Sequence, residues 1–243
     1  MGTRDPSELD TAGAGAVDTT RAATPERSSR QDIAAFLARA KQPGGSGRLV
    51  FAMDATLSRQ PSWDNAIAQQ GRMFEAVDEV GTLDVQLVYF RGLGECRASK
   101  WVSDTRSLRA IMERVDCRGG HTQIRKVLKH ALRQHADRKV SGLVLIGDAV
   151  EERIDDLCAL AGELGLRGVP IFAFHEGRDA TAGRAFKEMA RLSKGAHVPF
   201  GPGSAARLGE LLAAIAAYSA GGRKALESMG GAESRFLLEK LGE

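Results

Sequence analysis

The sequence predicts an α/β fold: a doubly wound, mostly parallel open sheet with helices on both faces and one short antiparallel edge strand. Two observations lead to this prediction. From Arg48 onward, short apolar runs alternate with longer stretches of helical periodicity, as in chains that build a parallel sheet. Three of the runs, at 48–54, 142–148 and 169–175, are continuously apolar, which suits central strands covered on both faces.

The same pattern assigns each element along the chain. The expected strands are 48–54, 83–90, 142–148, 169–175 and, with a weaker pattern, 196–200. The expected helices are 62–80, 105–115, 122–138, 152–166, 180–194 and 204–219. Residues 94–102, between the second strand and the next helix, are expected to form the added edge strand. Together these elements predict a domain at 46–220.

The two ends of the chain differ from this central region. Residues 1–28 are expected to form a disordered N-terminal tail, because the segment is nearly devoid of large aliphatic residues. A short helix and a Gly-rich linker are expected at 29–45, and a helical extension at 221–243. Apolar residues recur at helical spacing in this extension, which leaves two readings open: a docked terminal helix or a helix that binds a partner.

The composition limits the classes of protein that are possible. Apolar residues make up 43% of the chain and charged residues 27%, which is ordinary for a globular protein and argues against a fibrous or disordered one. The longest apolar run, at 211–218, has eight residues, far fewer than the roughly 18 that a membrane span needs. The first thirty residues hold no apolar core of a secretory signal. We therefore expect a cytoplasmic protein.

The cysteines and the overall charge indicate no particular chemistry. Cys96, Cys117 and Cys158 are odd in number and lack C-x-x-C spacing, so they indicate neither a disulfide framework nor a zinc site. They are expected to be small buried thiols. The formal net charge of +3 is too small to imply a nucleic-acid partner by itself.

Oxygen-bearing side chains gather where the predicted strands end. The stretch "MDATLSR" follows an apolar run and places Asp54, Thr56 and Ser58 on alternate residues. Asp148 ends another apolar strand, and Thr122 lies on the Gly-rich loop "CRGGHTQI" that opens a helix. Because ligands of a doubly wound sheet gather outside the carboxyl ends of its strands, these five side chains are expected to meet at one edge of the sheet.

The residue types at this edge indicate a hard divalent cation. Mg²⁺ prefers near-octahedral oxygen coordination and keeps several waters, so two carboxylates and a few hydroxyls form a natural partial shell. The two aspartates offset the charge of the ion without exceeding it, and one coordination position stays open to an acidic group from elsewhere. We expect Mg²⁺, or Mn²⁺, at a metal site made of Asp54, Thr56, Ser58, Thr122 and Asp148.

In these residues the chain resembles the von Willebrand factor type A family. The metal-ion-dependent adhesion site (MIDAS) of that family has the pattern Asp-x-Ser-x-Ser, followed by a distant Thr and a distant Asp. Asp54, Ser58, Thr122 and Asp148 match this pattern, and Thr56 replaces the first serine while keeping its hydroxyl. The resemblance implies that the three hydroxyls are direct ligands and that the two aspartates act directly or through water. It also implies a Rossmann-like fold and a non-catalytic module that binds an Asp or Glu side chain of a partner protein.

The resemblance covers roughly residues 46–220 and includes departures from the family pattern. A Gly-Ser-Met tripeptide is common in the family just inside the motif, whereas Leu57-Ser58-Arg59 stands here. These differences indicate a divergent, intracellular member of bacterial type.

Two other readings of the aspartates remain open. Asp54 and Asp148 also suit a simpler role as caps of the helices that follow their strands. An Asp at the end of the first strand, with a Thr two residues on and a distant acid, is also similar to phosphatases of the haloacid dehalogenase class. Those enzymes use an aspartyl-phosphate nucleophile and Mg²⁺. They usually carry a second Asp where Thr56 stands, and the lysine they require cannot be assigned here, so we expect a binding module and no enzyme.

A basic segment at 118–139 holds seven Lys or Arg residues and one acid. Three readings are open: a solvated helix face, a surface that draws an acidic partner toward the metal together with Arg59, or a nucleic-acid-binding helix. The sequence shows no aromatic-rich sheet face and no recognised nucleic-acid motif, so a nucleic-acid partner ranks last.

Four further side chains near the predicted site have less specific readings. Trp63 is expected either at the rim of the site or buried against the sheet. His121 either borders the site or has no role there. Glu151 and Glu152 are expected to start the next helix.

Overall fold

The computed structural model describes residues 46–78, 80–201 and 205–242. The tail expected at 1–28 and the helix and linker expected at 29–45 lie outside these ranges. Within the described ranges, no helix is both long and apolar enough to cross a membrane.

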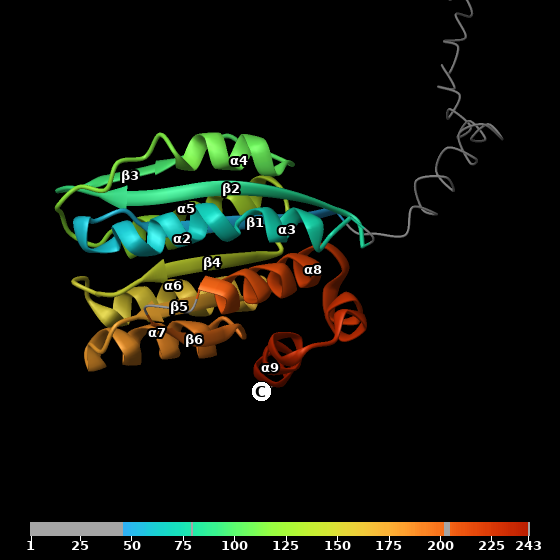
Figure 1. The fold of residues 1–243 in the computed structure, drawn as a ribbon. Helices are drawn as coiled ribbons and strands as arrows, with labels where there is room; N and C mark the ends of the chain where they lie inside the picture. The colour runs from blue at the N-terminus through green and yellow to red at the C-terminus, as the bar shows by residue number, and fades with distance from the viewer. Residues whose placement is uncertain (1–45, 79, 202–204, 243) are drawn as a thin grey trace, which may run out of the picture. The chain divides into compact units, whose positions relative to one another are not determined.

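One sheet of six strands organises the described part of the chain, in the order β3-β2-β1-β4-β5-β6. The strands are β1 (Ser46–Asp54), β2 (Thr82–Arg91), β3 (Glu95–Ala98), β4 (Gly142–Gly147), β5 (Ile171–Glu176) and β6 (Ala196–Phe200). β3 pairs with β2 in the antiparallel direction, and all other neighbours pair in parallel. The predicted fold class, with its antiparallel edge strand, is confirmed (Figure 1).

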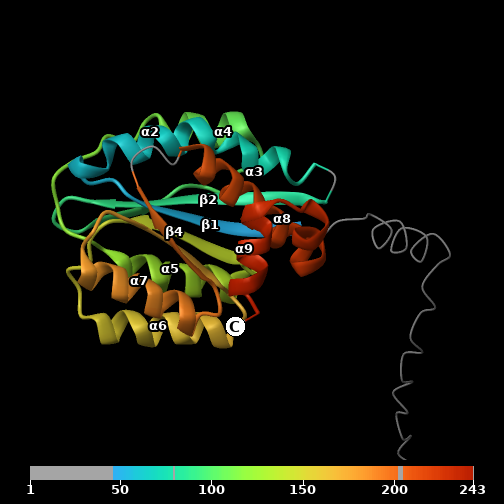
Figure 2. The same cartoon turned by 60° about the horizontal axis from the view of Figure 1, so that its bottom comes forward.

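Helices cover both faces of this sheet. They are the 3-10 helix η1 (Leu57–Arg59), α2 (Gln60–Gln69), α3 (Gly71–Glu75), α4 (Thr105–Met112), α5 (Ile124–Asp137), α6 (Ile154–Leu166), α7 (Ala180–Leu192), α8 (Ala205–Met229) and α9 (Ala232–Lys240). Figure 2 shows α2, α3 and α4 on one side of the sheet and α5, α6 and α7 on the other. Residues of α8 and α9 belong to the same hydrophobic cluster as those of α2, α3 and α4.

The continuous apolar run of β1 follows from its position in the sheet. Leu49 and Phe51 point into the core on the α2 side, whereas Val50 and Ala52 point into the core on the α5 side. All four are fully buried. A strand buried on both faces needs apolar residues at every position, which is why the alternation typical of a half-exposed strand is missing.

The structure differs from the sequence prediction in the extent of two elements. The helix expected at 62–80 is two shorter helices, α2 and α3, and the helix expected at 204–219 is the first part of a longer element, α8, that runs to Met229. A kink at Gly222, whose φ of 69° is left-handed, divides this long helix. Glycine adopts such a backbone without the steric cost that a Cβ brings, so one helical segment of α8 ends at the Gly-Gly pair and a second segment follows it.

The last helix, α9, packs onto the body of the protein. Leu237 is fully buried in the cluster on the α2 side, and Phe236, Leu238 and Leu241 pack against the same cluster. Burial of this apolar face against the chain itself supports the docked reading of the terminal segment.

The cysteines are less uniformly buried than expected. Cys117 is buried, but Cys96 and Cys158 are partly exposed. The expectation of three buried thiols is therefore wrong for two of them, because one lies on the edge strand β3 and the other on the outer helix α6.

Candidate metal centre

The order of the strands reverses between β1 and β4, since β2 follows β1 on one side and β4 flanks it on the other. Asp54 is the last residue of β1, and Asp148 directly follows β4. The two strands pair in parallel, with Met53 opposite Ile146, so their carboxyl ends lie side by side. This is the switch point at which doubly wound sheets bind ligands.

A chain of short contacts joins four of the five expected site residues. The backbone N–H of Thr56 donates to Asp54 Oδ1 over 2.7 Å. The hydroxyl oxygens of Thr56 and Ser58 lie 3.3 Å apart, and Ser58 Oγ donates to Asp148 Oδ2 over 3.3 Å. Residues far apart in the sequence thus bring four oxygen-bearing side chains into one cluster.

Thr122, the fifth residue, contacts the neighbouring loop instead. Its hydroxyl donates to Glu152 Oε2 over 2.6 Å and accepts from the backbone N–H of Glu151 over 3.0 Å. Its own backbone N–H donates to Glu151 Oε2 over 2.7 Å. Among the described residues, no hydrogen bond joins Thr122 to the other four. Thr122 is therefore linked to the cluster through the loop that begins with Asp148.

The positions of Glu151 and Glu152 correct the sequence interpretation. We expected them to start the next helix, but α6 begins at Ile154. Both precede that helix, and their carboxylates accept hydrogen bonds from the backbone at the start of α5, including the N–H of Arg125 over 3.0 Å. The two carboxylates lie at the positive amino end of α5, although they precede α6 in the sequence.

The Gly-rich loop that carries Thr122 is fixed from two sides. The N–H of Arg118 donates to the carbonyl of Ala55 over 2.9 Å, and the N–H of His121 donates to the carbonyl of Gly92 over 3.0 Å. A Cβ on Gly120 would lie 2.1 Å from the backbone nitrogen of Gly92. Glycine is thus required here by the close approach of two backbones.

The simpler role of the aspartates as helix caps does not match the geometry. The N-cap residue of α6 is Arg153, and that of α2 is Arg59, and neither helix has a side-chain cap hydrogen bond. Asp54 accepts from the N–H of Thr56, two residues on, and Asp148 accepts from Ser58. Both carboxylates face the cluster.

Asp54 is a buried carboxylate near the charges of Asp148 and Arg59. Burial raises the pKa of Asp54 to about 6, although the hydrogen bonds from Thr56 act in the opposite direction; the nearby charge of Asp148 raises it further. A buried anion is costly unless a cation or hydrogen bonds compensate it.

Arg59 places a cation of the protein itself beside the cluster. Its Nε lies 3.2 Å from Asp148 Oδ2 and 3.4 Å from Ser58 Oγ. Its terminal nitrogen forms an ion pair with Glu176 Oε2 at 2.7 Å, and the hydroxyl of Ser62 donates to the same oxygen. The guanidinium is buried, so it binds acids of the site, whereas the sequence interpretation had it attracting an external partner.

Sequence reasoning missed Glu176. It is the last residue of β5 and is buried, next to the strand that delivers Asp148. The only signal available was a Glu directly after the apolar run "IFAFH", which resembles the ends of β1 and β4.

The donor set fits a hard cation. Two carboxylates and three hydroxyls are oxygen ligands of the kind that Mg²⁺ and Mn²⁺ prefer. In the part of the chain that the structure describes, no group of three or more His, Cys, Asp or Glu side chains is placed to hold a metal ion. A metal at this edge would therefore depend on hydroxyl ligands.

Three side chains near the cluster have clear positions in the structure. Trp63 is buried, with 1% of its surface exposed, and its indole N–H donates to the carbonyl of Met112, so it packs in the core and not at the rim. The ring of His121 is exposed and contacts Glu151, with Nδ1 3.0 Å from a carboxylate oxygen. Leu57, between two of the expected ligands, exposes 66% of its surface.

Comparisons with known proteins agree with this architecture. No protein-family model matches the sequence, and no curated protein matches it. Among solved structures, the chain is similar to a von Willebrand factor type A protein from Catenulispora acidiphila, with a TM-score of 0.59 and 14% identity over 72% of this chain. It is also similar to the von Willebrand factor domain of the type V pili tip protein Mfa5 from Porphyromonas gingivalis, with a TM-score of 0.58 and 12% identity over 70% of this chain and 95% of that one.

A third similar structure carries a metal in its own MIDAS motif. It is proximal thread matrix protein 1 from the mussel byssus, described with a zinc-occupied MIDAS motif, with a TM-score of 0.50 and 17% identity over 71% of this chain and 45% of that one. The chain spans less than half of this protein and 43% of the Catenulispora protein. The fold is that of von Willebrand factor type A domains.

Proposed function

We propose that this chain is a non-catalytic binding module that holds a divalent cation and captures an acidic side chain of a partner protein. The observation that carries the proposal is the contact chain from Asp54 through Thr56 and Ser58 to Asp148. It gathers hydroxyls and carboxylates at the switch point of the sheet, and the spacing of these residues is that of a metal-ion-dependent adhesion site.

The proposed ligands are Asp54, Thr56, Ser58, Thr122 and Asp148, with Mg²⁺ or Mn²⁺ as the ion. When bound, the cation supplies a Lewis-acidic position for a carboxylate oxygen of the partner. The buried carboxylate of Asp54 provides negative charge that water does not screen. The close contacts of the Gly-rich loop keep Thr122 at the same edge.

Arg59 gives this site a competing cation. Because its guanidinium contacts both Ser58 and Asp148, a divalent ion has to share or displace that charge. The proposal therefore includes a moderate metal affinity, which depends on where the Arg59 side chain lies.

The partner is proposed to present Asp or Glu. The basic segment at 118–139 begins in the loop that carries Thr122. A positive surface beside the metal increases the rate at which an acidic partner associates. The exposed Leu57 offers an apolar contact beside the captured carboxylate.

Thermal melting of the full chain tests the proposal. The wild type and Asp148→Ala are melted in EDTA and in millimolar Mg²⁺ or Mn²⁺. Ligand at about 100 times its dissociation constant stabilises by about 2.7 kcal/mol, and each kcal/mol raises the melting temperature of a domain of this size by about 2–4 °C. We expect a metal-dependent rise in the wild type only. An equal rise in both proteins would refute the assignment of Asp148.

Partner capture has its own control. A protein retained on the immobilised chain in Mn²⁺ should be released by EDTA and should not be retained by Asp148→Ala. Substitution of one Asp or Glu of that partner by Asn or Gln should abolish capture. Retention that survives both EDTA and the Asp148 substitution would place the binding surface elsewhere.

A further inference from the structure

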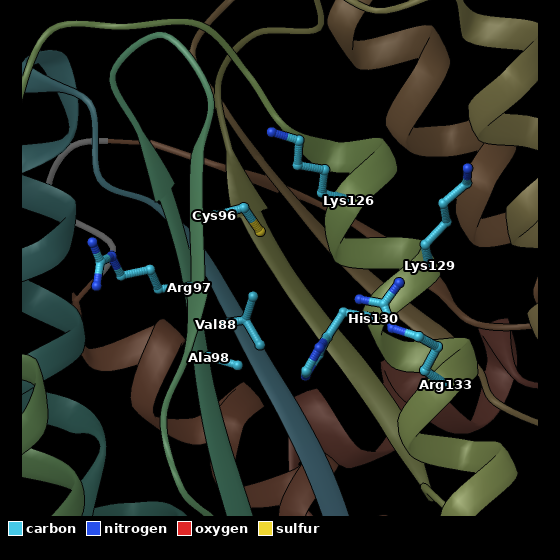
Figure 3. Close-up of a pocket in the computed structure, with 8 residues that line it drawn as sticks. All are labelled: Val88, Cys96, Arg97, Ala98, Lys126, Lys129, His130 and Arg133. Atoms are coloured by element: carbon cyan, nitrogen blue, oxygen red, sulfur yellow. The ribbon is translucent and has the colours of Figure 1, made fainter.

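A basic hollow of about 280 Å³ lies on the opposite face of the sheet from α2, between β3 and α5 (Figure 3). Lys126, Lys129, His130 and Arg133 of α5 line one side of it, and Cys96 of β3 lines the other. None of the lining residues is acidic. None is a proposed metal ligand, so the hollow is separate from the candidate metal centre.

The cations of the hollow differ in how far they are already paired. Arg97 of β3 forms an ion pair with Glu95 at 2.7 Å and points away from α5 in Figure 3. The ammonium of Lys126 donates to the carbonyl of Gly94 over 2.7 Å, which uses one of its three donors. Within the described ranges, the side chains of Lys129 and Arg133 form no ion pair and no hydrogen bond. The charges of Lys129 and Arg133, and the two remaining donors of Lys126, are therefore available to an anion in the hollow.

The cations of the hollow shift the pKa values of two neighbouring groups, the thiol of Cys96 and the imidazole of His130. Burial raises the pKa of the Cys96 thiol, and Lys126 and Arg133 act in the opposite direction. Burial lowers the pKa of His130, and Arg133 lowers it further. The imidazole Nε2 lies 2.8 Å from Gln86 Oε1. None of the residues that line the hollow carries a carboxylate, and Glu95 on β3 pairs with Arg91 and Arg97.

The spacing of the cations sets the length of a matching anion. Residues 126, 129 and 133 lie on successive turns of one helix face, and seven residues of α-helix rise about 10 Å. A single carboxylate or orthophosphate is too short to contact all three side chains. A chain of two or three phosphates has the charge and the length to do so, and phosphate oxygens form strong charge-assisted bonds with Lys and Arg.

We propose that this hollow binds an oligophosphate chain through Lys126, Lys129 and Arg133. The volume is slightly below the range of about 300–1,000 Å³ typical of sites for whole drug-sized ligands. No Phe, Tyr or Trp side chain lines it, so it lacks the large aromatic surfaces on which bases usually stack. The phosphate chain itself is recognised, whether it comes from a free oligophosphate or from the phosphates of a nucleotide.

Calorimetric titration of the full chain with sodium tripolyphosphate tests the proposal. EDTA in the buffer keeps metal binding out of the measurement. We expect binding by the wild type and a loss of affinity of about tenfold or more in Lys129→Gln/Arg133→Gln, because two charge-assisted contacts are removed. The matched control Lys139→Gln/Lys224→Gln removes the same charge from exposed positions outside the hollow and should bind within about twofold of wild type. Absence of binding by the wild type, or an equal loss in the control, would overturn the proposal.

Protection of Cys96 from alkylation locates the ligand. Cys96 lies in the hollow, whereas Cys158 on α6 is also partly exposed and lies outside it. Tripolyphosphate should slow the modification of Cys96 by iodoacetamide and leave the rate at Cys158 unchanged. Equal slowing at both thiols, or at neither, would overturn the proposal.

Two further titrations test which kinds of phosphate chain the hollow binds. ATP in EDTA should bind about as tightly as tripolyphosphate, because only its phosphates are recognised. A duplex DNA oligonucleotide that binds more tightly than tripolyphosphate and protects Cys96 equally would overturn the proposal and assign the surface to a nucleic-acid backbone. Since these experiments exclude divalent metal, their failure leaves the proposed metal function untouched.

Discussion

The guanidinium of Arg59 lies against the carboxylate of Asp148, with Nε 3.2 Å from Oδ2. Arg59 follows Ser58 directly in the chain, whereas Asp148 comes from the far side of the switch point. The same guanidinium reaches Glu176 at the end of β5. One side chain thus links the ends of three strands and partly neutralises the acids that we assign to a metal.

Replacing Arg59 is expected to tighten metal binding. Arg59→Gln removes the competing charge and should lower the dissociation constant for Mn²⁺ by about tenfold, or about 1.4 kcal/mol. It should also cost about 3 kcal/mol of stability, because Glu176 loses a buried partner. Calorimetric titration and chemical unfolding measure the two effects.

Arg118→Gln is the control for this substitution. Arg118 is exposed and pairs only with Asp116 among the described side chains. An unchanged or weaker Mn²⁺ affinity in Arg59→Gln, relative to Arg118→Gln, would show that the guanidinium does not compete with the ion.

The two glycines of the loop before Thr122 should respond differently to alanine. A Cβ on Gly120 would overlap the backbone of Gly92, whereas a Cβ on Gly119 would lie 3.8 Å from the nearest atom, on Leu57. Gly120→Ala is expected to cost about 1–3 kcal/mol and to weaken Mn²⁺ binding, because the loop has to move. Gly119→Ala should leave both nearly unchanged. Equal behaviour of the two variants in melting and titration would contradict this role of the loop.

The docking of α9 should be visible as stability. Leu237→Ala removes a fully buried side chain and is expected to cost about 2–4 kcal/mol. Leu166→Ala, at a leucine that exposes 90% of its surface, should change the free energy of unfolding by less than about 0.5 kcal/mol. If urea unfolding gave Leu237→Ala the stability of wild type, α9 would be only loosely attached.

His197 is expected to make stability depend on pH. Burial lowers the pKa of His197 to about 4, and the charges of His175 and Lys187 act in the same direction. In the unfolded chain an ordinary histidine titrates near 6.5, so the unfolded state binds the extra proton first. The stability that the neutral ring contributes is present above pH 6.5 and is lost as pH falls toward 4.

Substitution isolates this contribution. His197→Gln should lose about 1–2 kcal/mol less than wild type between pH 7 and pH 4.5, after allowance for the partial exposure of the ring. Unfolding in urea at several pH values measures the difference. Identical pH dependence in the two proteins would show that the pKa of His197 is the same in the folded and unfolded states.

The sequence predicted well which segments form strands and which of them lie in the centre or at the edge of the sheet, because hydrophobic periodicity is a local signal. The continuous run through Leu49 and Phe51 identified a central strand, and the short segment around Cys96 identified the edge strand. Helix ends were less accurate. Gly222 ends one helical segment of α8 and a second segment follows directly, so the sequence showed the break but not that both segments belong to one element.

The candidate site divides in the same way. Asp54, Thr56 and Ser58 are so close in the sequence that their spacing alone predicts a cluster. Asp148 was predicted because it directly follows an apolar strand. The contacts of Arg59 with Glu176, and of Glu152 with Thr122, join segments that the sequence leaves unrelated. Such pairs depend on how the loops approach one another in three dimensions.

Direct titration of the full chain with Mn²⁺, followed by the electron paramagnetic resonance signal of the free ion, tests the central claim. The wild type should bind Mn²⁺ at a single site, Asp148→Asn should lose that binding, and Asp155→Asn, which alters an exposed carboxylate on α6, should retain it. Equal Mn²⁺ binding by wild type and Asp148→Asn, or none by the wild type, would contradict a metal centre at the switch point.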